Sequence, residues 1–197
     1  MTAPTPAASG IDTARIEAAV REILAAIGED PSREGLEATP RRVAEAYAEF
    51  FAGMGVSTDA LLADSVISGQ SGELVVIRDI EFRSVCEHHL LPFLGVAHVA
   101  YLPDAKVVGL GTIAKLVDVI ATRPQLQERL TEEIADALEV GLEPLGVLVV
   151  LDAVHGCVTS RGPRQAHSST VTLAGRGTLA DASARQEALA MIGFPHE

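Results

Sequence analysis

The sequence predicts an α+β protein in which helices back an antiparallel sheet and a pair of helices precedes the sheet. The first observation is the order of hydrophobic periodicities, which runs helix pair, strand pair, helix pair, strand pair and final helix. The second is composition, because 48% of the 197 residues are hydrophobic but only 4% are aromatic. The core must therefore be built from Val, Leu, Ile and Ala, in one domain with an N-terminal appendage.

The appendage is predicted to be a helical arm over residues 11–55, after a loose tail over residues 1–10 that has little to bury. Its first helix spans Asp12 to Ile27, with apolar residues at helical spacing, and Gly28 ends it. Its second helix begins at Thr39-Pro40, with Thr39 as the cap and Pro40 at the first helical position. We interpret the arm as a packing or oligomerisation element.

A connector over residues 56–72 is rich in Gly and Ser, and we expect a short helix within it around Asp59 to Ala63. It leads into the predicted catalytic domain, residues 73–197. There, Leu74 to Arg83 has the pattern of a half-buried strand, and Leu94 to Leu102 forms a second strand after a loop. The two segments together predict an antiparallel hairpin whose tip, with the loop Leu90 to Phe93, carries the sequence Cys-Glu-His-His.

Two further helices follow the hairpin, one from about Leu110 to Ile120 and one from about Leu126 to Leu138. Val147 to Val154 is a nearly unbroken apolar run of strand length, which is typical of a central strand. Ser168 to Leu173, rich in Thr and Val, predicts another strand. A final helix is predicted from about Leu179 to Ile192.

Charge and cysteine usage exclude several classes of protein. The formal net charge of −12 argues against a nucleic-acid-binding surface, which needs a basic face. Two cysteines do not make a disulfide scaffold and point to a reducing compartment. The N-terminus lacks the pattern of a secretory signal, and no apolar stretch reaches the roughly 18 residues of a membrane span. We therefore expect a cytoplasmic protein without nucleic-acid or membrane partners.

Both cysteines lie in segments that also contain histidine, Cys86-Glu87-His88-His89 and His155-Gly156-Cys157. Cys86 and His89 form a C-x-x-H pair that can reach one ion, and Cys157 can supply a third ligand from a distant segment. Two thiolates and one imidazole can hold zinc with one position open, as catalytic sites do. The alternatives are a disulfide, two unrelated thiols, or a four-ligand structural site that uses His88 or His155 as well.

Other polar residues near these segments suit a nucleotide. His88 and His155 can move protons near neutral pH. Glu128 can accept two N–H bonds from an amidine edge such as that of guanine, although a solvated first-turn glutamate is the simpler interpretation. Arg161 can bind phosphate in a bidentate manner or be plain surface charge, and Lys115 is a weaker candidate of the same kind.

Four segments resemble the GTP cyclohydrolase I family, in the order TPRRVAEAY, IEFRSVCEHHLLPFLGVAHVAYLP, RPQLQERLTEEIADAL and HGCVTSRG. The resemblance covers nearly the whole chain. It implies the tunnelling fold (T-fold), in which subunits of a homo-oligomer, typically a decamer, pair their antiparallel sheets into a barrel with active sites at subunit boundaries. It also implies a zinc-dependent hydrolase that opens the imidazole ring of GTP, releases C8 as formate and forms 7,8-dihydroneopterin triphosphate, a pterin of tetrahydrofolate biosynthesis.

The resemblance also implies roles for individual residues at the metal. Cys86, His89 and Cys157 would bind zinc, and a zinc-activated water would attack C8. His88 and His155 would transfer protons, with His155 serving the purine N7.

At the substrate, the resemblance implies that Glu128, with help from Gln127, binds the guanine edge. Arg161 would hold phosphate, assisted by Arg42 from a neighbouring subunit. Lys115 stands where the family has an arginine.

One stretch departs from the family pattern. The family has Gly-Leu-Ser-Lys after the second strand, where serine contacts the ribose and lysine the triphosphate, but here the stretch is Gly109-Leu110-Gly111-Thr112. Three interpretations follow. The protein is a GTP cyclohydrolase I with a weakened grip on phosphate, a diverged relative that uses another nucleotide or stops at a formamidopyrimidine, or a non-catalytic zinc-containing oligomer that binds purines.

Overall fold

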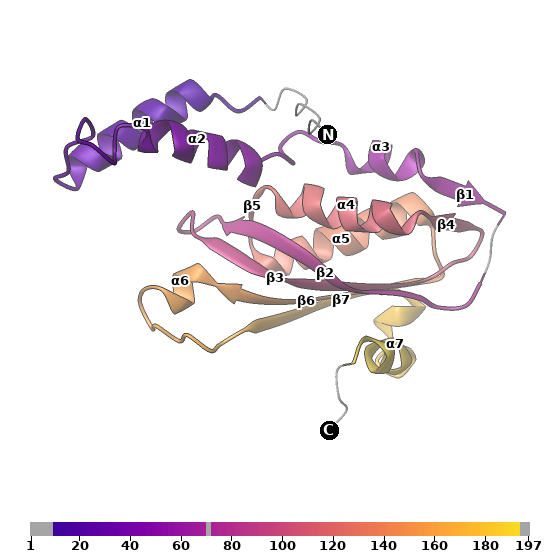
Figure 1. The fold of residues 1–197 in the computed structure, drawn as a ribbon. Helices are drawn as coiled ribbons and strands as arrows, with labels where there is room; N and C mark the ends of the chain where they lie inside the picture. Colours follow the sequence, from indigo (N-terminus) through magenta and orange to yellow (C-terminus); the bar gives the residue numbers. More distant parts are fainter. Residues whose placement is uncertain (1–9, 70–71, 194–197) are drawn as a thin grey trace. The chain divides into compact units, whose positions relative to one another are not determined.

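The computed structural model describes residues 10–69 and 72–193, and Figure 1 shows its elements in chain order. The chain divides into two compact units, Met1–Gly55 and Val56–Glu197. The tail predicted over residues 1–10 lies outside the described residues except for Gly10.

The first unit is a pair of helices, α1 (Thr13–Ala26) and α2 (Thr39–Phe50). Asp12 caps α1, since its carboxylate accepts a hydrogen bond from the Arg15 backbone N–H at 3.0 Å. The prediction that Thr39 caps α2 was wrong. Thr39 is already helical, Ala38 occupies the cap position, and the Thr39 hydroxyl donates back to the Gly35 carbonyl oxygen.

The apolar stripe of α1 is only partly covered within this unit. Val20 is buried, whereas Ile23 and Ile27 are 58% and 71% exposed. On α2, Tyr47 packs edge-on against Phe51 with ring centroids 5.5 Å apart, and both side chains remain half-buried. The first unit therefore presents apolar surface that its own two helices do not bury.

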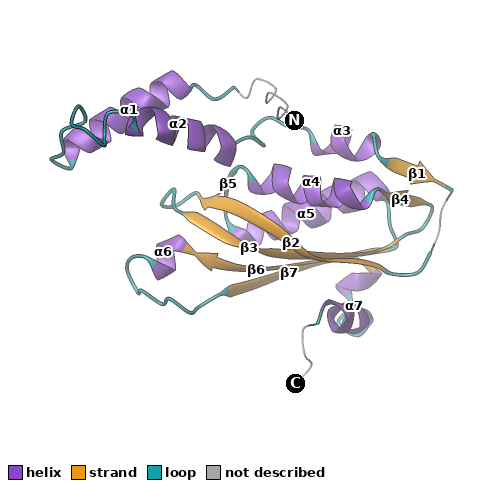
Figure 2. Ribbon diagram, viewed as in Figure 1, coloured by secondary structure: helices purple, strands orange, loops and turns teal. Residues whose placement is uncertain are grey.

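The second unit is built on a five-stranded sheet with the order β5-β2-β3-β6-β7 (Figure 2). Four strands pair antiparallel, and β5 pairs with β2 in parallel over two residues. The bounds are β2 Val75–Cys86, β3 Pro92–Leu102, β5 Pro124–Gln125, β6 Gly146–His155 and β7 Thr170–Gly177. The predicted α+β class, with strands paired in two hairpins, is confirmed, and β6 is central among the long strands.

Two helices back the sheet, α4 (Leu110–Ala121) and α5 (Gln127–Leu142). Their apolar faces meet the inner side chains of β2, β3 and β6, and the resulting core is almost entirely aliphatic. A smaller apolar cluster joins β3 and β6 to the C-terminal segment, which holds the 3₁₀ turn η1 (Thr178–Ala180) and α7 (Ala184–Ile192). The single final helix predicted from Leu179 is thus two shorter elements.

The segment predicted as a connector contains the expected short helix, α3 (Thr58–Ala63). It also contains a strand that was not predicted, β1 (Val66–Ser68), which pairs antiparallel with β4 (Lys106–Val108). Leu62 of α3 is 1% exposed within the main core. These contacts make the segment part of the packed second unit.

The predicted loop Leu90 to Phe93 is shorter than expected, because β3 already begins at Pro92. Phe93 is fully buried in the core. No helix among the described residues is long and apolar enough to cross a membrane.

Candidate active site

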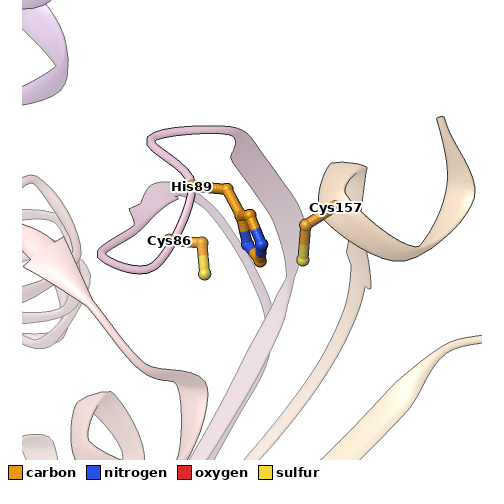
Figure 3. A group of neighbouring side chains, drawn as sticks. All are labelled: Cys86, His89 and Cys157. Carbon is orange, nitrogen blue, oxygen red and sulfur yellow. The ribbon is translucent and has the colours of Figure 1, made fainter. Parts of the chain in front are cut away.

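The three predicted metal ligands come together at one end of the sheet (Figure 3). Cys86 is the last residue of β2, His89 lies in the loop that follows, and Cys157 lies in the short helix α6 (Gly156–Thr159) after β6. One ligand atom from each residue lies within 4.8 Å of the other two. The donor set of two sulfurs and one imidazole nitrogen suits zinc.

The loop between β2 and β3 is closed by its own backbone. The Cys86 N–H donates to the Leu91 carbonyl oxygen at 2.9 Å, and the Leu90 N–H donates to the Cys86 carbonyl oxygen at 2.8 Å. Leu90 has a φ of 52°, a conformation that non-glycine residues seldom adopt. This tight turn holds Cys86 and His89 at the tip of the hairpin.

Cys157 reaches the loop because β6 lies beside β3. His155 is paired with Phe93 in the sheet register, so the chain leaves β6 next to the start of β3. A Cβ at Gly156 would lie 2.7 Å from the Pro92 carbonyl oxygen, so only glycine permits this close approach. Burial and the neighbouring Cys86 sulfur raise the pKa of the Cys157 thiol. A metal ion must therefore displace a proton to bind this sulfur.

His155 is held by Gln127, the first residue of α5. The two side chains meet at 2.7 Å between His155 Nε2 and Gln127 Oε1. Gln127 Nε2 donates to the Leu151 and Thr170 carbonyl oxygens and to the Thr172 hydroxyl, which fixes the orientation of the amide. Its Oε1 can only accept, so Nε2 of His155 carries the proton and Nδ1 is left as the basic atom of the neutral ring.

The environment of His155 favours this neutral form. Its ring stacks on Phe93 with centroids 4.6 Å apart and planes 8° apart. Burial lowers the pKa of His155, and the nearby Glu128 carboxylate only partly opposes this effect. The imidazole is therefore ready to accept a proton near neutral pH rather than already charged.

Three more of the predicted residues lie near the same end of the sheet. His88 is exposed in the loop, with its ring centroid 6.3 Å from that of His89. Arg161 follows α6 and is exposed, with Nη1 at 3.2 Å from His89 Nε2. Glu128 is exposed in the first turn of α5.

Within the second unit, the predicted substrate residue Lys115 lies on α4, away from this cluster. Lys115 is exposed on α4, one turn beyond Gly111 and Thr112. α4 begins just after β4, and Lys106 of β4 pairs with Glu143 at 3.0 Å, beyond the C-terminal end of α5. His155 lies at the opposite end of α5, against its first residue Gln127, and the 16 residues of this helix span about 24 Å. Arg42 is exposed on α2 in the first unit.

A side-chain network beside the metal loop was not anticipated from the sequence. Arg129 contacts Glu87, the residue after Cys86, and also Gln125 and the Pro124 carbonyl oxygen. The only signal in the sequence was the four-residue spacing of Gln125, Arg129 and Glu133, which places them on one side of a chain entering a helix.

Comparison with known families adds an independent observation. Residues 16–193 match the sequence model of the family described as GTP cyclohydrolase I. The chain belongs to the GTP cyclohydrolase I family. The predicted resemblance is therefore confirmed over most of the chain.

Curated members of the GTP cyclohydrolase I family show high identity. The protein named GTP cyclohydrolase 1 from Leifsonia xyli subsp. xyli is 63% identical over 186 residues, which cover 94% of this chain and 97% of that protein. Proteins of the same name from Geobacillus kaustophilus and Thermobifida fusca are 53% and 52% identical, and the matches cover 92% and 94% of this chain and 97% and 91% of those proteins.

Among solved structures, the archaeosine synthase QueF-Like in its apo form aligns with 55% of this chain and 97% of its own, at a TM-score of 0.46 and 20% identity. Membership of the GTP cyclohydrolase I family rests on the sequence matches.

Proposed function

We propose that the protein is a zinc-dependent GTP cyclohydrolase I that opens the imidazole ring of GTP, releases C8 as formate and forms 7,8-dihydroneopterin triphosphate. The observation that carries this proposal is the convergence of Cys86, His89 and Cys157, next in sequence to His155, whose ring is oriented by Gln127. The names of the relatives that match nearly end to end support the same activity. The two free thiols suit a reducing compartment, which supports a cytoplasmic location.

Cys86, His89 and Cys157 would hold the zinc ion, whose contribution when bound is to lower the pKa of water to about 7. His155 accepts a proton at Nδ1, because Gln127 keeps the proton of the neutral ring on Nε2. His88, exposed in the same loop, is placed to exchange protons between the site and solvent. The two histidines thus divide proton transfer between His155, which is held by Gln127, and the exposed His88.

At the purine end, Glu128 is the residue we assign to the guanine edge, because its carboxylate is exposed and lies close enough to influence His155. Gln127 supports guanine binding indirectly, because its side-chain amide is already hydrogen-bonded to the sheet and to His155. Arg161 supplies a guanidinium next to His89 and is assigned to phosphate.

We further propose that the enzyme is a homo-oligomer, a decamer by analogy with its family. The Gly111-Thr112 stretch lies toward the other end of α5 from His155, and Lys115 lies midway along α4, which supports a second copy as the source of these residues at a given metal cluster. Among the described residues, β7 pairs only with β6 and exposes its other edge, which favours pairing with another chain. Ile23 and Ile27 add uncovered apolar surface.

Light scattering on the purified protein tests the assembly. We expect a mass several times the 20.6 kDa of the chain, with formate release lost on dilution to the monomer. A monomer that retains full activity would contradict the shared site.

Restoring the family residues at the start of α4 is expected to tighten substrate binding. Gly111→Ser combined with Thr112→Lys adds a hydroxyl and an ammonium that can reach a triphosphate. One charge-assisted hydrogen bond is worth about 1.5–3 kcal/mol, so the KM for GTP should fall by about one to two decades. Gly111 has open space around it but Thr112 is 9% exposed, so Gly111→Ser with Thr112→Gln, which adds a long side chain without the charge, is the control for packing. An unchanged KM would show that other residues hold the phosphates.

The proposed reaction is tested by incubating the zinc-loaded protein with GTP and following formate together with the absorbance and mass of the product. Formate with dihydroneopterin triphosphate is the expected result. A ring-opened product without the pterin would favour the diverged enzyme, which the Gly111-Thr112 stretch supports because it alters the ribose and phosphate end. If none of GTP, GDP, GMP or guanosine reacts, the result would support the interpretation that the protein is a non-catalytic oligomer that binds purines.

A further inference from the structure

Arg129 lies in the first turns of α5, the helix that begins with Gln127 and Glu128. Its guanidinium makes four contacts. Nη2 lies 2.5 Å from Glu87 Oε2 and 3.0 Å from the Pro124 carbonyl oxygen, while Nε donates to Gln125 Oε1 at 3.0 Å and lies 3.6 Å from Glu133 Oε1. One side chain therefore connects α5, β5 and the metal-binding loop.

The inner end of this network is fixed. Gln125 is 1% exposed, and its Nε2 donates to the Ile120 carbonyl oxygen and to Glu133 Oε2. Because the Gln125 amide N–H groups are used in this way, its Oε1 must face Arg129. The guanidinium is thus held from the protein interior, and its outer edge is presented to Glu87.

Glu87 is the outer end of the network and sits between Cys86 and His88. Its backbone N–H donates to the Gln125 carbonyl oxygen at 3.1 Å, so both its main chain and its side chain are tied to the segment that leads into α5. The other loop bonds, between Cys86 and Leu90 or Leu91, are internal to the loop. They shape the turn but do not set its position relative to α5.

We propose that Arg129 is a positioning residue that holds the metal-binding loop in register with the first turn of α5. The ligands Cys86 and His89 are in or next to that loop. Glu128, which is assigned to guanine, and Gln127, which holds His155, are in that turn. The ion pair therefore adds to the Glu87–Gln125 backbone bond and the β2–β5 pairing in setting the distance between the metal and the purine. This inference rests on the proposed function, because it needs a metal and a purine at these two places.

Loss of the Arg129–Glu87 ion pair should affect the metal site more than it affects the stability of the fold. The Arg129 and Glu87 side chains are 41% and 33% exposed, and ion pairs of that exposure add little to global stability. Supporting contacts around metal ligands, in contrast, typically change metal affinity or activity by about 10–100-fold. Loss of the pair should consequently alter the site while the melting temperature stays nearly constant.

The test compares Arg129→Gln, Glu87→Gln, the double variant and Arg129→Lys with the wild type. Zinc affinity is measured by competition with a chromophoric chelator, and kcat and KM for GTP are measured on zinc-saturated protein. We expect each single variant to lose about tenfold in zinc affinity and in kcat, with KM changed less. The double variant should be no worse than Arg129→Gln, because Glu87→Gln removes only a contact that Arg129→Gln already removes.

Two variants make this result specific. Arg129→Lys keeps one ion pair but not the fork to Gln125 and Glu87, so it should recover part of the loss. Arg176→Gln is the matched control. Arg176 pairs with Glu132 and Asp136 on the same helix α5 but from β7, away from the metal loop. Its loss should leave zinc affinity and kcat unchanged.

The outcomes separate this inference from the proposed function. If the wild type binds zinc and releases formate but Arg129→Gln equals it in zinc affinity and kcat, the positioning role is refuted. The same holds if Arg176→Gln weakens zinc binding as much as Arg129→Gln does, because the effect is then general loosening of α5. A wild type that binds no zinc refutes the proposed function, and the inference falls with it.

Discussion

Replacing Cys157 with alanine is expected to remove zinc and to reduce formate release from GTP by at least about a thousandfold. Cys157 supplies one of three ligand atoms, and its segment supplies no other sulfur. Two remaining ligands would bind zinc weakly, and the nucleophile that a zinc ion generates at neutral pH would be lost with it. Metal analysis and formate release on the same preparation measure both effects.

The control for this prediction is His167→Ala, an exposed histidine beyond α6 that is not among the candidate site residues. It should keep both zinc and activity. Since α6 is short and Cys157 is only partly buried, circular dichroism should show the fold retained in Cys157→Ala. A Cys157→Ala protein that is free of zinc and still active would falsify the metal site.

Replacing His155 with alanine is expected to lower kcat by about 10²–10⁴-fold while zinc remains bound. That range is typical for loss of a positioned proton-transfer group. The ring is oriented by Gln127 and by stacking on Phe93, so its removal takes away an aligned base rather than a metal ligand. Steady-state kinetics with zinc-saturated protein give kcat, and KM should change less.

The zinc content of His155→Ala decides between two interpretations of the cluster. Retained zinc with lost turnover supports a three-ligand catalytic site with a separate base. Zinc lost together with turnover would instead indicate that His155 is a fourth ligand, which is the structural-site alternative that the sequence left open.

Much of the fold could be predicted because its long elements have clear periodicity. β6 was visible as an apolar run of strand length, and α4 and α5 as apolar stripes. The three-residue strands β1 and β4 are too short for any period to emerge, so their pairing was missed. The prediction that Thr39 caps α2 was wrong because the preceding turn continues directly into the helix, which makes Thr39 a helical residue. A residue type that is common at caps does not by itself fix where a helix begins.

The metal cluster could be predicted because cysteine and histidine are scarce in this chain and their spacing is informative. The contacts that orient it could not. Gln127 and His155 are 28 positions apart, and Arg129 and Glu87 are 42 positions apart. Glutamine and arginine are common on helices. Only the tertiary contacts show that Gln127 holds His155 and that Arg129 holds the metal-binding loop.

The pairing of Phe93 with His155 has a consequence for how the protein folds. His89 and Arg161 flank the metal cluster yet are 72 positions apart, so the site is a contact of high sequence separation. Closing such a long loop carries an entropic penalty that local hairpin formation does not. During synthesis the β2–β3 hairpin, which carries the metal-ligand residues Cys86 and His89, can form before β6 has been made. A metal ion held by Cys86, His89 and Cys157 would therefore bind fully only after β6 lies beside β3, and it would stabilise the formed sheet rather than nucleate it.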